Sequence, residues 1–367
     1  MENKNVGLFD KTYFNPAVFE KYVEQIERER TNELLSSPAI VRRDDLKARM
    51  QEQVGGNIIV TPISGILTGD ADNYDGQTDI KSDSTTTFYQ KRVVVGRAHS
   101  WTEKDFAFDI TGGEDPMKPV ANQILDWWAD LKQDSLLAIL EGIFKMTGAN
   151  NKKFVDEHTY EDKAFGQVTL NNSLQKAFGS KKNNFAAAIM NSAVATQLEN
   201  LQLVQYARFT DSRGIERPMA LANLNGRPII IDDSLPVNGD KYTSYILGKG
   251  AFEYTEAGAK KPYETDRNPA KNGGEDTLYT RDRWCFAPRG ISFTEEAMVS
   301  LSPTDKELAN GKNWEVVADP DNNTFPLNQI PIARVITGIA DLTGGSVTVN
   351  AEDVRVEDAG AGSKPQE

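Results

Sequence analysis

The sequence has a single cysteine, Cys285, and only two histidines, His99 and His158. One cysteine cannot form an intrachain disulfide, which fits folding in a reducing compartment. These residues also argue against a zinc site, because such sites draw several Cys and His ligands at short spacings. We expect Cys285, between Trp284 and Phe286, to be a buried and inert thiol, and His99 to be a packing residue.

The sequence also lacks apolar runs long enough to span a membrane. No window approaches the ~20 consecutive apolar residues that a membrane-spanning helix needs. The nearest candidate, residues 330–342, is interrupted by Arg334 and Asp341. The N-terminus has no basic stretch followed by an apolar one, so we expect no secretory signal. The sequence therefore predicts no membrane association.

An excess of positive charge is the third absence. There are 54 Asp and Glu against 41 Lys and Arg, for a formal net charge of −13. Proteins that bind nucleic acid tightly carry a basic face, so we expect only weak contact with DNA. The 16 Phe, 11 Tyr and 5 Trp can build a core, which excludes disorder of the whole chain. The length allows about two domains, or one elaborated domain.

Two segments near the N-terminus are expected to project from the body. Residues 16–35 predict an amphipathic helix with a narrow apolar stripe, which suits a helix that lies on a partner. Residues 57–63 and 85–95 are β-rich and predict a two-stranded arm. The connection through residues 69–79 is far longer than a usual hairpin turn, so we expect it to leave the body and rest on a neighbour.

The rest of the chain predicts one long helix and a mixed α/β region. Apolar residues recur at helical spacing over 115–147, with Asp115-Pro116 as a start signal and Gly148 as an end signal. We further expect a polar loop at 149–169, a helix at about 187–203, strands at 227–232, 243–247, around 284–286 and about 330–336, a second long loop at 254–276, a short helix near 305–309, a short strand or hairpin at 347–356 and a disordered tail from 359.

Acidic residues are the candidates for a calcium site or a catalytic pair, but their spacing fits neither. The Asp-rich runs that begin at Asp70 and Asp319 lack the glycine and the final glutamate of a calcium-binding loop. Asp232 and Asp233 are adjacent on a predicted strand and should point to opposite faces, which makes a poor catalytic pair. A hydrolase that uses Asp232 or Asp266 remains an alternative. The sequence shows no phosphate-binding glycine loop and no nucleophile elbow, so we predict no enzyme activity and no cofactor.

Several stretches resemble a known family. They are Asp115-Pro116-Met117 before a helix that carries Trp128-Ala129, the run from Ile231 to Val237, the run from Tyr242 to Ala251, the run from Trp284 to Thr294, and the run from Pro303 to Trp314. Together with the order of elements, they resemble the tailed-phage major capsid proteins of the Hong Kong 97 fold, in particular the coat proteins of long-tailed phages of Gram-positive bacteria. The resemblance covers roughly residues 50–335.

The resemblance implies an α+β fold with an N-terminal arm, an extended two-stranded loop, a long spine helix and a mixed α/β axial domain around the capsomer centre. The implied division is an N-terminal arm at 1–56, an extension loop at 57–98, a peripheral domain at 99–184 with the spine helix at 115–147, an axial domain at 185–280 whose loop at 254–276 points toward the local symmetry axis, a return to the peripheral domain at 281–335, and a C-terminal extension and tail at 336–367.

The implied function is a coat protein that self-assembles into hexamers and pentamers of an icosahedral head around double-stranded DNA. The expected partners are a separate scaffolding protein, a portal protein and a decoration protein, and the expected location is the virion after assembly in the bacterial host cytoplasm. An encapsulin-like compartment of the same fold is an alternative. The subunit-interface candidates are Arg42, Arg43, Asp70, Asp72, Asp75, Asp79, Lys81, Tyr263 and Arg267.

The family's founding member cross-links Lys to Asn between subunits. Lys81 and Lys91 lie in the corresponding loop, but no acceptor Asn or activating carboxylate can be identified, so we do not predict cross-linking. Within the shell, the net negative charge should keep DNA from adhering to the wall.

Overall fold

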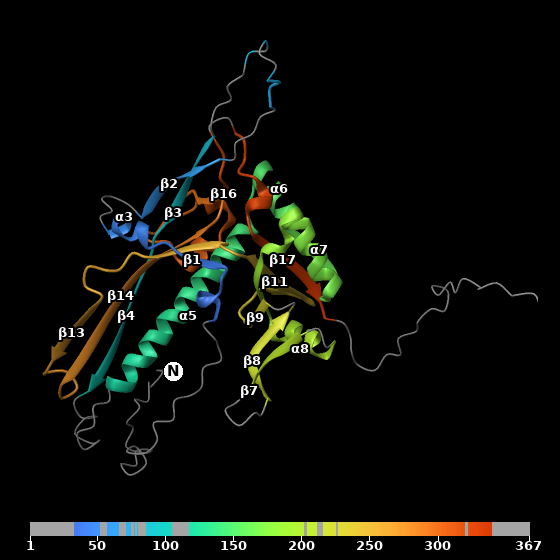
Figure 1. The fold of residues 1–367 in the computed structure, drawn as a ribbon. Coiled ribbons are helices and arrows are strands. Elements are labelled where there is room, and N and C mark those ends of the chain that lie inside the picture. The colour runs from blue at the N-terminus through green and yellow to red at the C-terminus, as the bar shows by residue number, and fades with distance from the viewer. Residues whose placement is uncertain are drawn as a thin grey trace, which may run out of the picture.

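The computed structural model describes residues 33–51, 57–65, 71–74, 77, 79, 86–104, 117–201, 204–210, 216–224, 227–319 and 322–339. Two β-sheets lie on either side of a long helix, α5 (Met117–Ile143), which crosses the molecule diagonally in Figure 1. The 27 residues of α5 correspond to a length of about 40 Å. The expected amphipathic helix at 16–35 lies outside the described residues except for α2 (Glu33–Ser36), and the predicted strand or hairpin at 347–356 and tail from 359 also lie outside them.

The first sheet is built around one long strand, β14. Its N-terminal half lies between β13 and β4, and its C-terminal half pairs with β12, which is joined in parallel by β1. The strands are β1 (Ile40–Arg42), β4 (Val95–Lys104), β12 (Phe252–Glu256), β13 (Tyr263–Asn268) and β14 (Glu275–Pro288). The short elements η1 (Asp44–Leu46) and α3 (Lys47–Gln51) follow β1.

A separate hairpin lies above this sheet in Figure 1, formed by β2 (Ile58–Ser64) and β3 (Thr87–Val93). The two strands are antiparallel, with Ile58 opposite Val93 and Ser64 opposite Thr87, which confirms the predicted two-stranded arm. A small ladder of β15 (Ile291–Phe293) and β16 (Trp314–Val316) lies close to β3. The helix α9 (Asp305–Leu308) and the turn η3 (Gly311–Asn313) connect these two strands.

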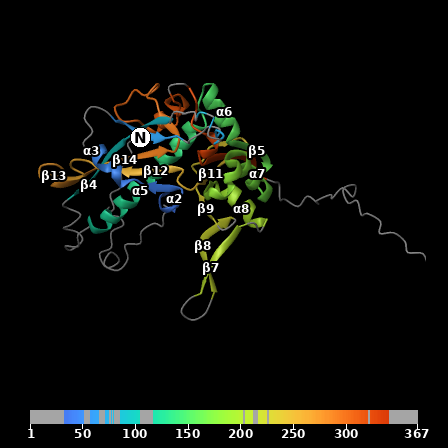
Figure 2. The same ribbon diagram turned by 45° about the horizontal axis from the view of Figure 1, so that its top comes forward.

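The second sheet has the strand order β5-β17-β11-β6-β9-β8-β7, with β10 on β11. The pair β7–β8 extends away from the rest of the sheet (Figure 2). The strands are β5 (Thr159–Ala164), β6 (Phe185–Met190), β7 (Val204–Thr210), β8 (Glu216–Leu224), β9 (Arg227–Ile231), β10 (Val237–Asn238), β11 (Lys241–Gly248) and β17 (Ile332–Gly338). The helical elements around it are α6 (Ala149–Glu157), α7 (Gln167–Phe178), η2 (Gly179–Asn184), α8 (Ser192–Asn200) and η4 (Leu327–Gln329).

Alternation along the strands of the second sheet creates two apolar layers. On β6, Ala187 and Ile189 join the cluster around α5, whereas Ala188 and Met190 join a cluster with residues of α7 and α8. Successive side chains of a strand point to opposite faces, so a strand between two helical layers must be apolar throughout. The result is a three-layer body with α5 on one face of the sheet and α7 and α8 on the other.

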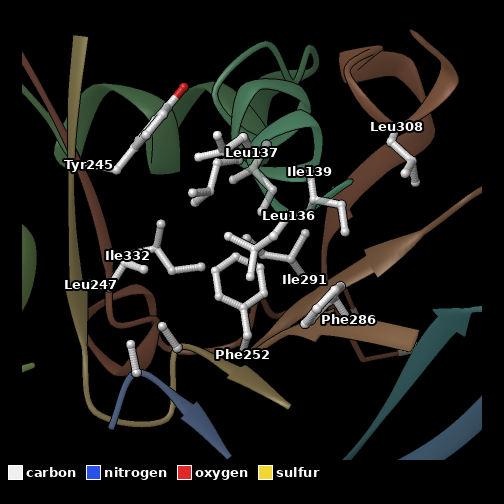
Figure 3. Packing of buried hydrophobic residues seen from close by; sticks show 14 of the residues in the cluster. Leu136, Leu137, Ile139, Tyr245, Leu247, Phe252, Phe286, Ile291, Leu308 and Ile332 are labelled. Carbon is white, nitrogen blue, oxygen red and sulfur yellow. The ribbon is translucent and has the colours of Figure 1, made fainter. Parts of the chain in front are cut away.

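The main core lies where α5 meets both sheets. On α5, Leu136, Ile139, Leu140 and Ile143 are fully buried at helical spacing. Figure 3 shows Leu136 and Ile139 near residues of both sheets, which are Phe252 and Phe286 of the first and Tyr245, Leu247 and Ile332 of the second. The end of α9 approaches α5 closely at Gly142, where a Cβ atom would lie 2.1 Å from the Leu308 carbonyl oxygen. The long helix therefore connects the two sheets through a shared core.

Two expected elements are wrong, and a third ends earlier than expected. The polar segment 149–169 is not a loop, because it contains α6, β5 and the start of α7. Phe154 is fully buried, and so are the polar residues His158 and Thr169, whereas most of the other polar residues are exposed or half-buried. The helix expected at 187–203 divides into strand β6 and helix α8, because the apolar run is buried on both faces and Asn191 caps a new helix through its Oδ1. The long helix ends at Ile143 rather than at Gly148, which instead precedes α6 with φ +100°.

The loop expected at 254–276 is also wrong, because the segment forms strands. This segment contains most of β12, all of β13 and the start of β14. Every residue of β13 is exposed, so the strand owes its conformation to pairing with β14 and not to an apolar pattern. The expected axial range 185–280 therefore joins strands of two different sheets, and its boundary falls inside β14.

Candidate functional site

The inner face of the β2–β3 hairpin is held to the body by polar contacts. The buried Gln90 side-chain amide donates to the carbonyl oxygens of Pro288 (2.6 Å) and Ile291 (2.9 Å). The backbone N–H of Lys91 donates to the Ser292 hydroxyl at 3.1 Å. Phe88 packs edge-on against Phe325, with ring centroids 5.6 Å apart. These contacts join the base of the hairpin to the turn after β14 and to β15.

A second anchor is the buried guanidinium of Arg92. Its Nη1 lies 2.6 Å from Oε2 of Glu253, and its Nε donates to the Thr61 hydroxyl at 2.8 Å. The same Glu253 oxygen lies 3.1 Å from Nη1 of Arg43. One carboxylate on β12 therefore joins the hairpin to the segment that follows β1. A charge this far from solvent needs such partners to offset its desolvation.

Arg42 and Arg43, two of the predicted interface residues, have partners in their own chain. Arg43 forms a bidentate pair with Asp45, at 2.8 Å for both bonds. The hydrogen bond from Asp45 raises the pKa of the Arg43 guanidinium, and that from Arg43 lowers the pKa of the Asp45 carboxyl. Arg42 lies 3.4 Å from Glu256 and 3.7 Å from Asp44. Within one subunit, neither arginine needs the acidic loop as a partner.

The acidic loop between β2 and β3 is described only in part. Asp79 is exposed and Asp72 is half-buried, and residues 71–74 lie beyond the hairpin at the top of Figure 1, far from β1. The other predicted residues of this loop, Asp70, Asp75 and Lys81, lie outside the described residues. The described residues of this loop therefore make no contact with the Arg42-Arg43 patch inside one subunit, and the expected contact stays a prediction about neighbouring subunits.

The outer face of the hairpin carries apolar side chains into solvent. Val60 is 51% exposed and Tyr89 is 58% exposed, and Tyr89 lies opposite Pro62, which is also exposed. Farther along, Tyr74 is 92% exposed. Large exposed apolar patches are typical of surfaces that another protein covers. We call Val60, Pro62 and Tyr89 the outer stripe.

Tyr263 and Arg267 both lie on β13, an edge of the first sheet. Tyr263 is exposed, and the Arg267 guanidinium lies 2.9 Å from Asp276 on the paired strand β14. The structure places these two residues on one strand. They are far from Arg42 in the sequence, but β13 and β1, which carries Arg42, belong to the same sheet. An exposed edge strand can accept another chain, and charged residues limit such pairing.

One exposed apolar feature has no clear signal in the sequence. Val299 and Leu301 are each 94% exposed on the loop before α9. The Glu307 carboxylate fixes this loop by accepting from the backbone N–H groups of Val299 (2.7 Å) and Ser300 (3.0 Å). Backbone donors hold the pKa of the Glu307 carboxyl at about 2, with Thr304 the largest contributor. The alternation of Val and Leu with Ser resembles a half-buried strand, and only the structure places these side chains in solvent.

Among the described residues, Asp232, Asp233 and Asp266 do not lie together as a catalytic group. Asp232 is buried and accepts from the Gln133 amide at 2.6 Å and the Ser234 hydroxyl at 2.6 Å, whereas Asp233 accepts from the Ser192 backbone N–H. The two carboxylates serve separate turns, and Asp266 lies on the exposed strand β13. Within the described ranges, no group of three or more His, Cys, Asp or Glu side chains converges as a metal site requires.

The isolated residues singled out in the sequence pack as structural groups. Cys285 is buried, and burial raises the pKa of its thiol to about 12. His99 packs edge-on against Trp101 and at a tilt against Trp127, at centroid distances of 4.8 and 5.0 Å. Among the described helices, none has the length and apolar character needed to span a bilayer.

Comparison with known proteins identifies this architecture. Residues 118–324 match the family described as Gp13-like, major capsid protein 13-like. The chain is 31% identical over 282 residues to the major capsid protein of Bacillus phage SPP1, which covers 76% of this chain and 84% of that protein.

Solved structures share the fold at low sequence identity. The cyanophage Pam1 capsid asymmetric unit matches with a TM-score of 0.53 and 8% identity, over 87% of this chain and 95% of that chain. The head structure of Helicobacter pylori bacteriophage KHP40 matches with a TM-score of 0.50 and 9% identity, over 92% and 99%. The chain therefore belongs to the Gp13-like major capsid protein family, as a structural protein of a tailed-phage capsid with the Hong Kong 97-type fold and not an enzyme.

Proposed function

We propose that this capsid protein forms hexamers and pentamers of an icosahedral head around double-stranded DNA, and that its β2–β3 hairpin lies over an adjacent subunit. The supporting observation is the hairpin itself. Its inner face is anchored to its own body through Gln90 and Arg92, while its outer stripe is left in solvent. A hairpin that is fixed on one side and apolar on the other is suited to contact with another copy.

The nine predicted interface residues remain proposals. Arg42 and Arg43 already neutralise acids of their own chain, so a neighbour's acidic loop would extend an existing charge network. Exposed ion pairs contribute little each, so these charges should set the register of subunits more than the strength of their contact. Reversal of Asp72 alone should impair assembly, and a second reversal at Arg42 should restore it in part.

The domain assignment is a proposal that follows the sheets. The peripheral domain would contain the first sheet with α5, β15 and β16, and the axial domain would contain the second sheet with α7 and α8. This assignment moves residues 252–280 to the peripheral domain, since they form β12, β13 and part of β14.

The proposal includes a separate scaffolding protein, a portal protein and a decoration protein as partners, weak contact with DNA, and assembly in the host cytoplasm. Support for these partners comes from the family resemblance alone. Co-expression with each candidate, followed by co-sedimentation with shells, tests each partner. A compartment that loads cargo enzymes is the second candidate function, and membership of the capsid protein family favours the phage head.

The experiment is deletion of residues 70–81, the loop that connects the two strands of the hairpin. Because none of the described core residues lies in this loop, the variant subunit should keep the thermal midpoint of the wild type while shells seen by electron microscopy become few or open. A deletion that unfolds the isolated subunit would refute the assignment of this loop as a projecting segment. Intact, equally stable shells would refute its role in assembly.

A further inference from the structure

A cavity of about 440 Å³ lies between η2, the turn after β14 and the segment that leads into β17. Two buried apolar residues, Phe178 and Pro331, belong to its lining. The other described residues that line it are two cations, Lys181 and Arg289, and four residues with side-chain amides. None of the described lining residues is acidic. A cavity of this composition offers hydrogen-bond donors to an anion.

Backbone contacts bring four segments together around this cavity. The N–H of Lys249 donates to the Asn184 carbonyl oxygen (2.8 Å), that of Gly248 to Pro331 (2.7 Å), and that of Arg289 to Ala251 (3.0 Å). The segments 179–184, 248–251, 288–292 and 326–331 contain four cations and no acid, in a chain with 54 acids among 367 residues. The charge imbalance is therefore local, and regular backbone contacts hold the cavity in place.

The cations at the cavity are not neutralised within the described part of the chain. The Lys181 ammonium donates a hydrogen bond to the side-chain oxygen of Gln329, which is neutral. No ion pair with a described carboxylate forms at Lys181 or Arg289, whereas Arg42, Arg43, Arg92 and Arg97 each have one. Two unneutralised cations beside several amide groups are a recurrent arrangement for binding phosphate oxygens.

We propose that this cavity binds phosphate groups and that its ligand is the phosphodiester backbone of nucleic acid. The net charge of −13 opposes general attraction to DNA, so contact must occur at a local cationic site. The inference rests on the proposed function, in which the shell encloses DNA. It locates the weak DNA contact at one place on each subunit, and it assigns the face that bears Lys181 and Arg289 to the interior of the head.

The test measures binding of a labelled 20-base-pair DNA duplex to the purified full chain by fluorescence anisotropy over a range of salt concentrations. The variant Lys181→Gln/Arg289→Gln removes both cavity cations. The matched control, Lys153→Gln/Lys306→Gln, removes the same charge from exposed positions on α6 and α9. We expect the cavity variant to bind about tenfold more weakly with a salt slope lowered by about two, and the control to stay within about twofold of the wild type.

Further measurements distinguish DNA from free phosphate as the ligand, and DNA binding from shell assembly. Asn183→Asp, which adds a negative charge to the lining with little change in shape, should also weaken DNA binding. Inorganic tripolyphosphate, titrated by calorimetry, should bind more weakly than DNA and compete with it. The variants are also scored for shell formation, which tests the proposed function separately from DNA affinity.

Each contrary outcome overturns the proposal in a distinct way. Equal weakening in the cavity variant and the control would mean that only overall charge matters. Binding of tripolyphosphate without binding of DNA would exclude nucleic acid as the source of phosphate. Unchanged DNA affinity with lost shell formation would mean that the cavity receives carboxylates of another copy. Failure of all variants and the wild type to form shells, with the DNA result as expected, would count against the proposed function alone.

Discussion

The β2–β3 hairpin and the second sheet solve opposite problems. The second sheet is closed on both faces by helices of the same chain, and its central strand β6 is buried throughout. The hairpin is closed on one face only, by polar anchors such as Gln90 and Arg92, and its outer stripe is exposed. The comparison indicates that one region completes its own core, whereas the other leaves apolar surface for a second subunit.

The largest expected change in the free energy of unfolding comes from a cavity in the core shared by the two sheets. Ile139→Ala on α5 removes a fully buried side chain between the two sheets, which should lower the free energy of unfolding by about 3 kcal/mol. Chemical denaturation of the subunit, followed by circular dichroism, measures the change. A loss below about 1 kcal/mol would mean that α5 does not join the sheets through a tightly packed core.

The next largest loss of stability is expected when the polar anchor of the hairpin is removed. Arg92→Met leaves Glu253 with Arg43 as its remaining partner and should cost about 2 kcal/mol. The matched control, Arg267→Met, breaks an ion pair between exposed side chains and should cost less than about 1 kcal/mol. Equal costs for the two variants would show that burial of Arg92 adds nothing to the anchor.

A pH prediction probes the closed region through His158. This ring is buried, stacks on Phe154, and its Nδ1–H donates to the Ile332 carbonyl oxygen at 2.7 Å. Burial lowers its pKa from 6.5 to about 4. The unfolded chain therefore binds this proton at a higher pH than the folded chain, so the stability that is complete above pH 6.5 is lost as the pH falls toward 4. The expected loss from this ring is about 2 kcal/mol between pH 7 and pH 5.

The control for this prediction is His158→Asn, which removes the titrating group. The variant should be less stable at pH 7, but its free energy of unfolding should depend less on pH between 7 and 5 than that of the wild type. Parallel pH dependences for the two proteins would contradict the assignment. The comparison of slopes isolates this residue from the carboxylates, which titrate in both proteins.

The smallest effect on the subunit is expected at the outer stripe. Val60→Ser/Tyr89→Ser should change the free energy of unfolding of the isolated subunit by less than about 0.5 kcal/mol, because both side chains are already exposed. The same variant should form fewer shells. Val168→Ser, at an exposed valine on α7, is the control and should preserve both properties. A variant that assembles normally would show that the stripe stays in solvent.

Sequence patterns predict elements well where the pattern is created by the element's own burial. The strands of the hairpin, the long helix and the strand around Trp284 follow such patterns and are confirmed. Strand β13 could not be predicted, because all of its residues are exposed and only its pairing with β14 makes it a strand. Strand β6 could not be predicted for the opposite reason. Its alanines are typical of helices, and because it is buried on both faces its apolar and polar residues do not alternate.

Contacts between distant residues explain what was missed at the functional surfaces. The positive charges of Arg42 and Arg43 are visible in the sequence, but their partners Glu256 and Glu253 lie on β12, far along the chain. The Glu253 carboxylate also holds Arg92, which no local pattern marks as buried. The segments around the cavity lined by Lys181 and Arg289 likewise come together only through the backbone contacts of the fold.

The most direct test of the difference between the two regions is a cryo-electron microscopy map of assembled shells at side-chain resolution. We predict that another copy of the chain covers Val60, Pro62 and Tyr89, while the packing of β6 between α5 and α7 stays within one subunit. A map in which the outer stripe faces solvent in every subunit would contradict the account.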